Sequence, residues 1–242
     1  SDVWQLKFNV NKCKSLHIGS RNPHHRYKML DAELEQADAE RDLGIYLDPE
    51  LKFRKQAATA VAKGNQLLAL IKRAFLKVDV ITLPMLYKTL VRPHLEYGNL
   101  VWGPFNRADE KLTERVQRRA TKLIKSIRHL PYEDRLRHLK LPSLYYRRRR
   151  GDMIAVYKIM NGKLDVQSEK FFEQAPSNVT RGHPQKLVKP TAQSRTRRKA
   201  LASRVINDWN ALPPSVVLSS SVNQFKSRLD DHWNQQKFTI LD

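Results

Sequence analysis

Cysteine is almost missing from this chain of 242 residues, which contains only Cys13. A single cysteine excludes an intramolecular disulfide and a zinc knuckle built from cysteines. Its scarcity is typical of proteins in a reducing, intracellular compartment, either nuclear or cytoplasmic. Eight glycines and twelve prolines are too few for a low-complexity polymer. We therefore expect a folded protein with a real core.

Long apolar runs and familiar catalytic motifs are missing as well. No segment approaches the ~20 apolar residues that a membrane-spanning helix needs, and no lipidation motif is present. The start, SDVWQLKFNV, lacks the basic-then-apolar pattern of a signal peptide. The patterns GxxxxGK[ST], GxGxxG, HExxH and GxSxG do not occur. The neighbouring His24 and His25 would point apart on a strand, so we expect no metal site from them.

Negative charge is in short supply. Lysine and arginine number 45 against 24 acids, which gives a net charge of +21, whereas a domain of this size usually carries about 2–8 charges. The excess indicates a polyanionic partner: RNA, DNA or an anionic membrane. The membrane is the weaker choice, because the basic residues are spread through the chain and no anchor accompanies them.

Basic residues follow their most regular spacing between residues 109 and 127. Five apolar residues recur at helical spacing and form one face: Leu112, Val116, Ala120, Leu123 and Ile127. Basic residues recur on the opposite side: Lys111, Arg115, Arg118, Lys122 and Lys125, with Arg119 beside them. Glu114 is the only acid between Lys111 and Ile127, so the stripe predicts a nucleic-acid contact surface. A solvated basic face is the alternative.

The remaining pattern predicts a mainly α fold with a small antiparallel β piece at the N-terminus. Alternating residues predict strands at Leu6–Val10, Ser15–Ile18, Tyr27–Leu30 and Leu43–Leu47. Asp48-Pro49-Glu50 predicts a helix start, followed by a bundle of three amphipathic helices. In this bundle Gly64 predicts a kink or a close approach, and Pro93 a bend or an end.

Further helices are predicted after Pro131. Ser143 caps one that runs from Leu144 to Met160 and carries Arg147, Arg148, Arg149 and Arg150, a second predicted basic patch. Residues 167–199 are polar, basic and without period, which predicts a linker. Two terminal helices follow, Ala200–Asn210 and Val222–Trp233, and the second has an apolar seam that ends in Trp233.

Several long strings resemble one family. FNVNKCKSLHIG, RDLGIYLD, LYKTLVRPHLEYGNLVWGP, VQRRATKLI and RVINDWNALPPSVV, in this order, are similar to the C-terminal half of non-LTR retrotransposon (LINE-type, jockey-like) reverse transcriptases. The resemblance implies that 1–48 is the end of the palm and that 49–130 is a helical thumb. The rest, with a helical connector at 131–166, the linker at 167–199 and helices at 200–242, resembles a C-terminal extension. It also implies that Lys12 lies near nucleotide phosphates and that Leu43-Gly44 is a primer-grip turn.

The resemblance implies an RNA-directed DNA polymerase that binds RNA, DNA and RNA–DNA hybrid. The palm motifs with the aspartates that hold Mg²⁺, including the [FY]-x-D-D turn, do not occur in this chain. We therefore expect it to be inactive alone and to pack against a palm and fingers that it lacks. Two alternatives stay open: a stand-alone nucleic-acid-binding remnant, and a scaffold that docks a protein on the seam ending in Trp233.

Overall fold

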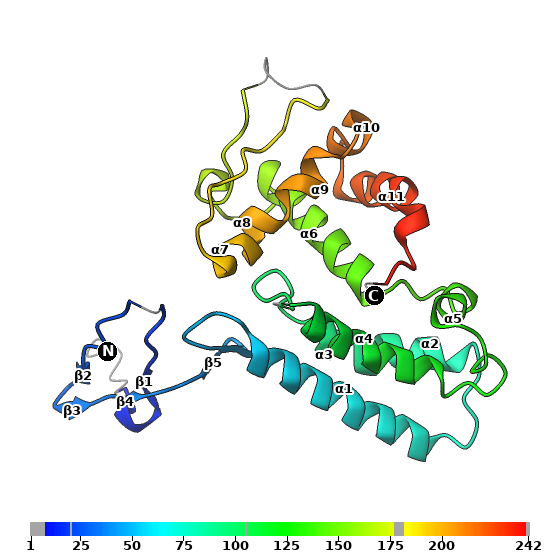
Figure 1. Cartoon of the computed structure of the whole chain (residues 1–242), viewed down its shortest axis with the longest axis horizontal. Helices are drawn as coiled ribbons and strands as arrows, with labels where there is room; N and C mark the ends of the chain where they lie inside the picture. Colours follow the sequence, from blue (N-terminus) through cyan, green and yellow to red (C-terminus); the bar gives the residue numbers. More distant parts are fainter. Residues whose placement is uncertain (1–7, 20, 105, 177–181, 241–242) are drawn as a thin grey trace.

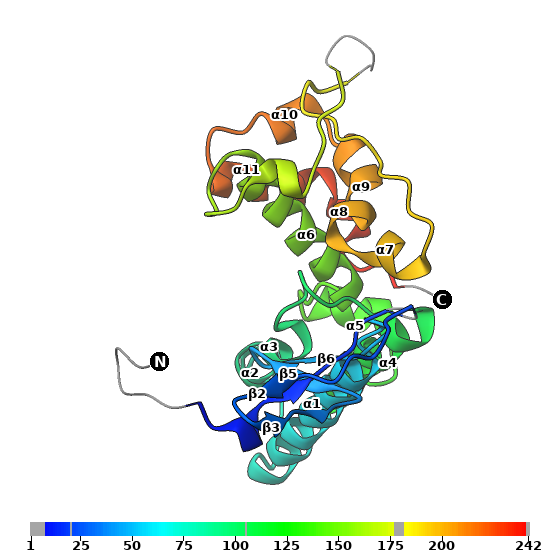
Figure 2. The same ribbon diagram turned by 90° about the vertical axis from the view of Figure 1, so that its left-hand side faces the viewer.

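The computed structural model describes residues 8–19, 21–104, 106–176 and 182–240. Over these ranges the fold is mainly α with a small β piece at the N-terminus, as predicted. Figure 1 shows this β piece at the left, a helical bundle below (residues 54–138, the lower bundle) and a second group of helices above it (residues 144–236, the upper lobe). The helix α6 (Leu144–Met160) rises from the lower bundle into the upper lobe (Figures 1 and 2).

The β piece consists of short two-stranded ladders. They pair β1 (Lys14–Ser15) with β4 (Glu35–Gln36), β2 (Lys28–Met29) with β3 (Ala32–Glu33), and β5 (Glu40–Asp42) with β6 (Ile45–Leu47). The last two ladders are antiparallel, as predicted, but β1 and β4 are parallel. The all-antiparallel expectation is wrong for this pair. The chain reverses once between β1 and β2 and again at the β2–β3 hairpin, so β4 runs in the same direction as β1.

The first predicted strand is also replaced by another structure. Val10–Lys12 form one turn of 3-10 helix, and Leu6 lies outside the described residues. The Asn9 side chain accepts a hydrogen bond from the Asn11 amide at 3.1 Å, while its carbonyl accepts one from the Lys12 amide at 3.0 Å. Such local bonds from asparagine compete with strand pairing.

The first long helix, α1 (Arg54–Ala74), begins later than Asp48-Pro49-Glu50 predicts. The Asp48 carboxylate does cap backbone amides, but those of Glu50, Lys52 and Phe53, at 3.1, 3.0 and 2.7 Å. These bonds close a loop in which Phe53 has a positive φ of 55°. The prediction was wrong because the same capping chemistry serves a loop as well as a helix.

The lower bundle packs α1 against three further helical segments and α4 (Arg107–Thr121). The segments form one run of chain: α2 (Thr82–Leu86), the π-helical turn η3 (Tyr87–Val91) and α3 (Arg92–Glu96). The helix does not end at Pro93, because the wider π turn accommodates the missing amide. A Cβ on Gly64 would lie 3.0 Å from Val116, so Gly64 marks a close approach of α1 to α4.

The upper lobe is built around α6. Below it lies α5 (Tyr132–His138), and the later helices are α7 (Arg195–Lys199), α8 (Leu201–Arg204), α9 (Ile206–Asn210), α10 (Pro214–Val217) and α11 (Val222–His232). The helix predicted over Ala200–Asn210 is thus divided at Val205. Trp209, Phe225, Leu229 and Trp233 are buried against α6, so the terminal seam is part of this core rather than an open face.

The segment predicted as a linker contributes to the same lobe. Phe172, His183 and Leu187 are buried, and the Leu187 amide donates to the Asn210 side chain at 2.9 Å. Gln174 and Leu187 form an isolated antiparallel bridge. These contacts have partners in helices that are distant in sequence, which explains why the segment has no period of its own.

Candidate nucleic-acid interface

The helix α4 carries the predicted basic stripe. Asn106 caps it, accepting a hydrogen bond from the Asp109 amide at 2.9 Å, and Asp109 and Glu110 occupy the first turn, where the helix dipole favours acids. The buried side is formed by Thr113, Val116, Gln117, Ala120 and Thr121. This arrangement confirms an amphipathic helix.

Two details of the predicted helix differ. It ends at Thr121 rather than at Ile127, and the chain continues in turns that still bury Ile124 and Ile127. Leu112, predicted on the apolar face, is 38% exposed. The apolar period continued past the end of the helix because buried turns also need apolar side chains, so periodicity alone did not mark the end.

The basic stripe is exposed to solvent. It comprises Lys111, Arg115, Arg118, Arg119, Lys122 and Lys125. None of the six forms an ion pair with another residue that the structure describes. Arg118 lies over the Tyr132 ring, 4.8 Å from its centroid. Lys122 and Lys125 follow the end of α4, so the stripe continues into the next turn.

Glu114, the only acid between Lys111 and Ile127, does not neutralise the stripe. Its carboxylate points toward the protein, where it accepts hydrogen bonds from the Tyr132 hydroxyl at 2.6 Å and the Leu144 amide at 3.0 Å. Burial raises the pKa of Glu114, and the bond from Tyr132 acts in the opposite direction. No local sequence pattern predicts this arrangement, since Tyr132 lies 18 residues away. From Lys111 to Lys125 the exposed charged side chains are therefore all basic.

The second predicted patch, Arg147–Arg150, is in a different situation. Arg147 donates to Glu96 at 2.7 Å, Arg149 to Asp208 at 2.8 and 2.7 Å, and Arg150 to Asp230 at 2.8 Å. Arg148 donates weakly to Thr113 at 3.4 Å and has a buried Nη2 without a hydrogen-bond partner. Burial lowers the pKa of Arg148. Their role in nucleic-acid binding stays a prediction, and the pairing weighs against it because the guanidinium groups are already engaged.

A hollow of about 250 Å³ separates the stripe from α6. Its lining includes Lys111, Arg115 and Arg118 from one side and Tyr145 and Arg148 from the other. Glu110 and Glu114 also line it, so the hollow has mixed charge while the outer face of α4 does not. The uniformly positive surface is therefore formed by the six exposed side chains of the basic stripe, from here on the α4 ridge, and not by this hollow.

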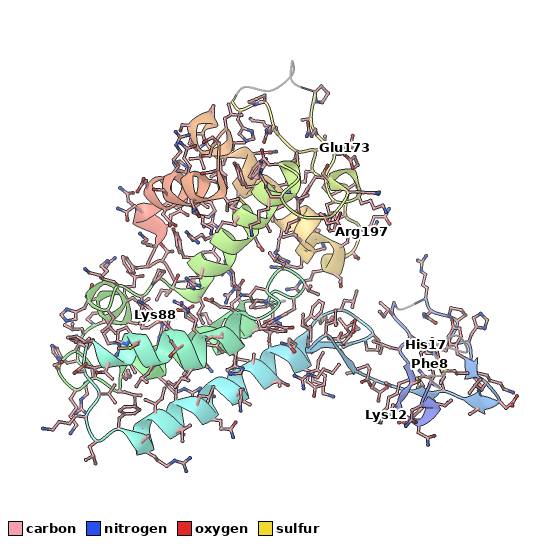
Figure 3. The ribbon with its side chains drawn as sticks, turned by 180° about the vertical axis from the view of Figure 1, so that it is seen from behind. Phe8, Lys12, His17, Lys88, Glu173 and Arg197 are labelled. Carbon is pink, nitrogen blue, oxygen red and sulfur yellow. The ribbon has the colours of Figure 1, made fainter. Side chains whose placement is uncertain are left out.

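The other predicted site residues lie in the β piece, away from α4. Lys12 is exposed at the end of the 3-10 turn (Figure 3). Leu43 and Gly44 form the turn between β5 and β6, with φ of 43° and 85°. The Leu43 carbonyl accepts a hydrogen bond from the Tyr97 hydroxyl at 2.8 Å, and its side chain is 84% exposed. Leu43 is a candidate contact residue, because it is a non-glycine residue held at positive φ with a largely exposed side chain.

Comparisons with protein-family models, with curated proteins and with solved structures gave no match. In the described part of the chain, no helix is both long and apolar enough to cross a lipid bilayer. Across the same residues, no three histidine, cysteine, aspartate or glutamate side chains come together as a metal site.

Proposed function

We propose that this chain is the end of the palm, the thumb and the C-terminal extension of a non-LTR retrotransposon reverse transcriptase, and that α4 grips the template–primer hybrid by its phosphates. The observation that carries the proposal is the ridge of six exposed basic side chains along α4 and the turn that follows it, which form no ion pair with other described residues. Like charges in a row repel one another, and a polyanion laid along them removes that repulsion. Phosphate contacts carry little sequence information, so binding should tolerate any sequence.

In this proposal Leu43 and Gly44 support the primer and Lys12 lies near the incoming nucleotide, as the family resemblance implies. The Tyr97 hydrogen bond to Leu43 supports such a role, because it fixes the β5–β6 turn to the helical run that precedes α4. The grip would hold a hybrid while the chemistry takes place on a palm outside this chain. A stand-alone nucleic-acid-binding remnant would use the same ridge, and the coding sequence upstream of residue 1 separates the two readings.

The Mg²⁺ that such a polymerase needs does not fit the described residues of this chain. Two-metal phosphoryl transfer requires convergent carboxylates, and the described residues contain no cluster of three potential ligands. The scaffold alternative is weakened, since the seam that ends in Trp233 is buried against α6.

Salt titration of binding to a labelled RNA–DNA hybrid tests the proposal. If about five phosphates are contacted, log K should fall against log salt with a slope near −4 to −5. The variant Arg115→Gln/Arg119→Gln/Lys122→Gln should reduce the slope by about three units and leave the fold intact, because all three side chains are exposed. This triple variant spares Arg118, whose ring contact with Tyr132 has a structural component.

The control removes the same charge elsewhere. Lys163, Lys170 and Lys226 belong to other elements and have no ion pair among the described residues. Their replacement by glutamine should change the slope by less than one unit. Equal weakening by both triple variants would mean that net charge, and not the α4 ridge, determines binding. A flat salt response of the unmodified chain would end the proposal altogether.

A further inference from the structure

The short helix α7 has an unusual composition for a surface helix. Its five residues, Arg195–Lys199, include four basic ones and bury no side chain. Arg197, Arg198 and Lys199 are exposed and form no ion pair with any residue in the described ranges. Core packing therefore does not explain why these three residues are basic.

The helix is nevertheless held in place. Ser194 caps it, accepting a hydrogen bond from the Arg197 amide at 3.1 Å. Thr196 donates to the Glu50 carbonyl at 3.3 Å, which joins α7 to the loop before α1. Arg204 donates to the carbonyls of Lys199 at 3.2 Å and Asn99 at 2.9 Å. These bonds fix α7 against the loop that leads into α4.

The position of α7 continues the ridge of α4. Lys199 and Glu110 line the same cavity of about 220 Å³, and Glu110 lies in the first turn of α4, next to Lys111. Burial raises the pKa of Glu110, and Arg148, Lys199 and Arg107 act in the opposite direction. Figures 1 and 2 both show α7 above the start of α4, and Figure 3 labels Arg197 on it.

Three acids line the cavity beside Lys199. Glu110 interacts electrostatically with Lys199, and the other two are paired elsewhere. Asp152 is engaged by Arg204 at 2.8 and 2.9 Å, and Asp208 by Arg149. The helix dipole favours basic residues at a C-terminus, but this contributes only about 0.3–1 kcal/mol at an exposed site. It does not account for three adjacent exposed cations that repel one another.

We propose that α7 is a second phosphate-contact surface, which extends the α4 ridge and binds the same duplex beyond the start of α4. The inference rests on the proposed function. From Lys111 to Lys122 the ridge measures about 16 Å at 1.5 Å per residue, which spans about five base pairs at 3.4 Å each. Contacts from α7 lengthen this footprint, so a duplex must exceed the length of the α4 ridge to benefit from them.

The test compares hybrids of two lengths with the variant Arg197→Gln/Arg198→Gln/Lys199→Gln. Each phosphate contact contributes about 0.9 log unit at 0.1 M salt. Loss of one or two contacts should weaken binding to a 20-base-pair hybrid about 10- to 100-fold. A hairpin with a six-base-pair hybrid stem, which the ridge alone can cover, should lose less than threefold. Arg197→Lys/Arg198→Lys should keep binding to the long hybrid, because it retains the charge.

The outcomes separate this inference from the proposed function. If the α7 variant binds the long hybrid like the unmodified chain while the Arg115/Arg119/Lys122 variant is weakened, the α7 surface is refuted and the grip by α4 stands. If neither variant is weakened, both are refuted. The Lys163/Lys170/Lys226 control should bind normally, and an equal loss in that control would also refute the inference, because net charge would then explain it.

Discussion

Arg149 offers the sharpest test of whether the arginine run on α6 holds the structure together or contacts nucleic acid. Its guanidinium donates to both Asp208 oxygens, at 2.8 and 2.7 Å, and to Gln236 at 2.8 Å. The group also lies 4.6 Å from the centroid of the Trp233 ring. It therefore joins α6 to α9 and to the turn after α11. We predict that Arg149→Gln destabilises the upper lobe and leaves hybrid binding unchanged.

The magnitude follows from these contacts. Hydrogen bonds to a charged group contribute about 1.5–3 kcal/mol each when buried, but the Arg149 and Asp208 side chains are 23% and 29% exposed, so solvent offsets much of this. With about 0.5–1 kcal/mol for the cation–π contact, the substitution should cost about 2–3 kcal/mol. In a chain of this size each kcal/mol shifts Tm by about 2–4 °C, which gives a decrease of about 4–12 °C.

Thermal and urea unfolding, followed by tryptophan fluorescence, measures the effect, since Trp209 and Trp233 lie in the affected core. Arg119→Gln on the exposed ridge is the matched control and should change stability by less than about 0.5 kcal/mol. The destabilisation of the double variant Arg149→Gln/Asp208→Asn should be smaller than the sum of the two single destabilisations by about 1–2 kcal/mol, because the two residues are in contact.

The two variants should therefore differ in which property they change. Arg149→Gln should lower Tm and keep the affinity for hybrid, whereas Arg119→Gln should keep Tm and lower the affinity for hybrid. If Arg149→Gln unfolds like the unmodified chain and binds hybrid tenfold more weakly, Arg149 does not hold the upper lobe together. Arg147–Arg150 would then be the nucleic-acid patch that the sequence predicts.

Three further predictions concern pH, backbone and catalysis. Burial lowers the pKa of His183 below 6.5, so the unfolded chain takes up the proton first and stability should fall as pH drops below about 6.5. Urea titrations at pH 7 and 5 should show a smaller loss of stability for His183→Gln than for the unmodified chain, and equal losses would contradict this. Gly98→Ala should destabilise the fold by about 2–4 kcal/mol, since φ is +69° and the added Cβ would clash with Ile45. Gly162→Ala, where φ is +61° and the added Cβ would meet open space, should cost about 1 kcal/mol in the same unfolding assay. The chain alone should not extend a primer on RNA with Mg²⁺, because the [FY]-x-D-D turn with its metal-binding aspartates does not occur in its sequence. Primer extension above a no-protein control would show that the palm is misplaced.

Local sequence determined the mainly α class and the ridge itself. A 3.6-residue period and an excess of one charge are properties of neighbouring residues, so α4, with its buried Val116 and exposed Arg115, could be predicted directly. The same reasoning failed where one local signal has two structural uses. The Asp48 carboxylate caps a loop instead of α1, and the apolar period after Thr121 belongs to buried turns.

Tertiary structure alone decided which basic residues remain available. Arg147, Arg149 and Arg150 look as basic in the sequence as Arg115, but they find Glu96, Asp208 and Asp230 at separations of 51, 59 and 80 residues. Such partners depend on how α6 packs against α3, α9 and α11, which no local pattern specifies. The sequence therefore determined where positive charge is concentrated, while packing determined which of those charges are neutralised by the protein and which face solvent.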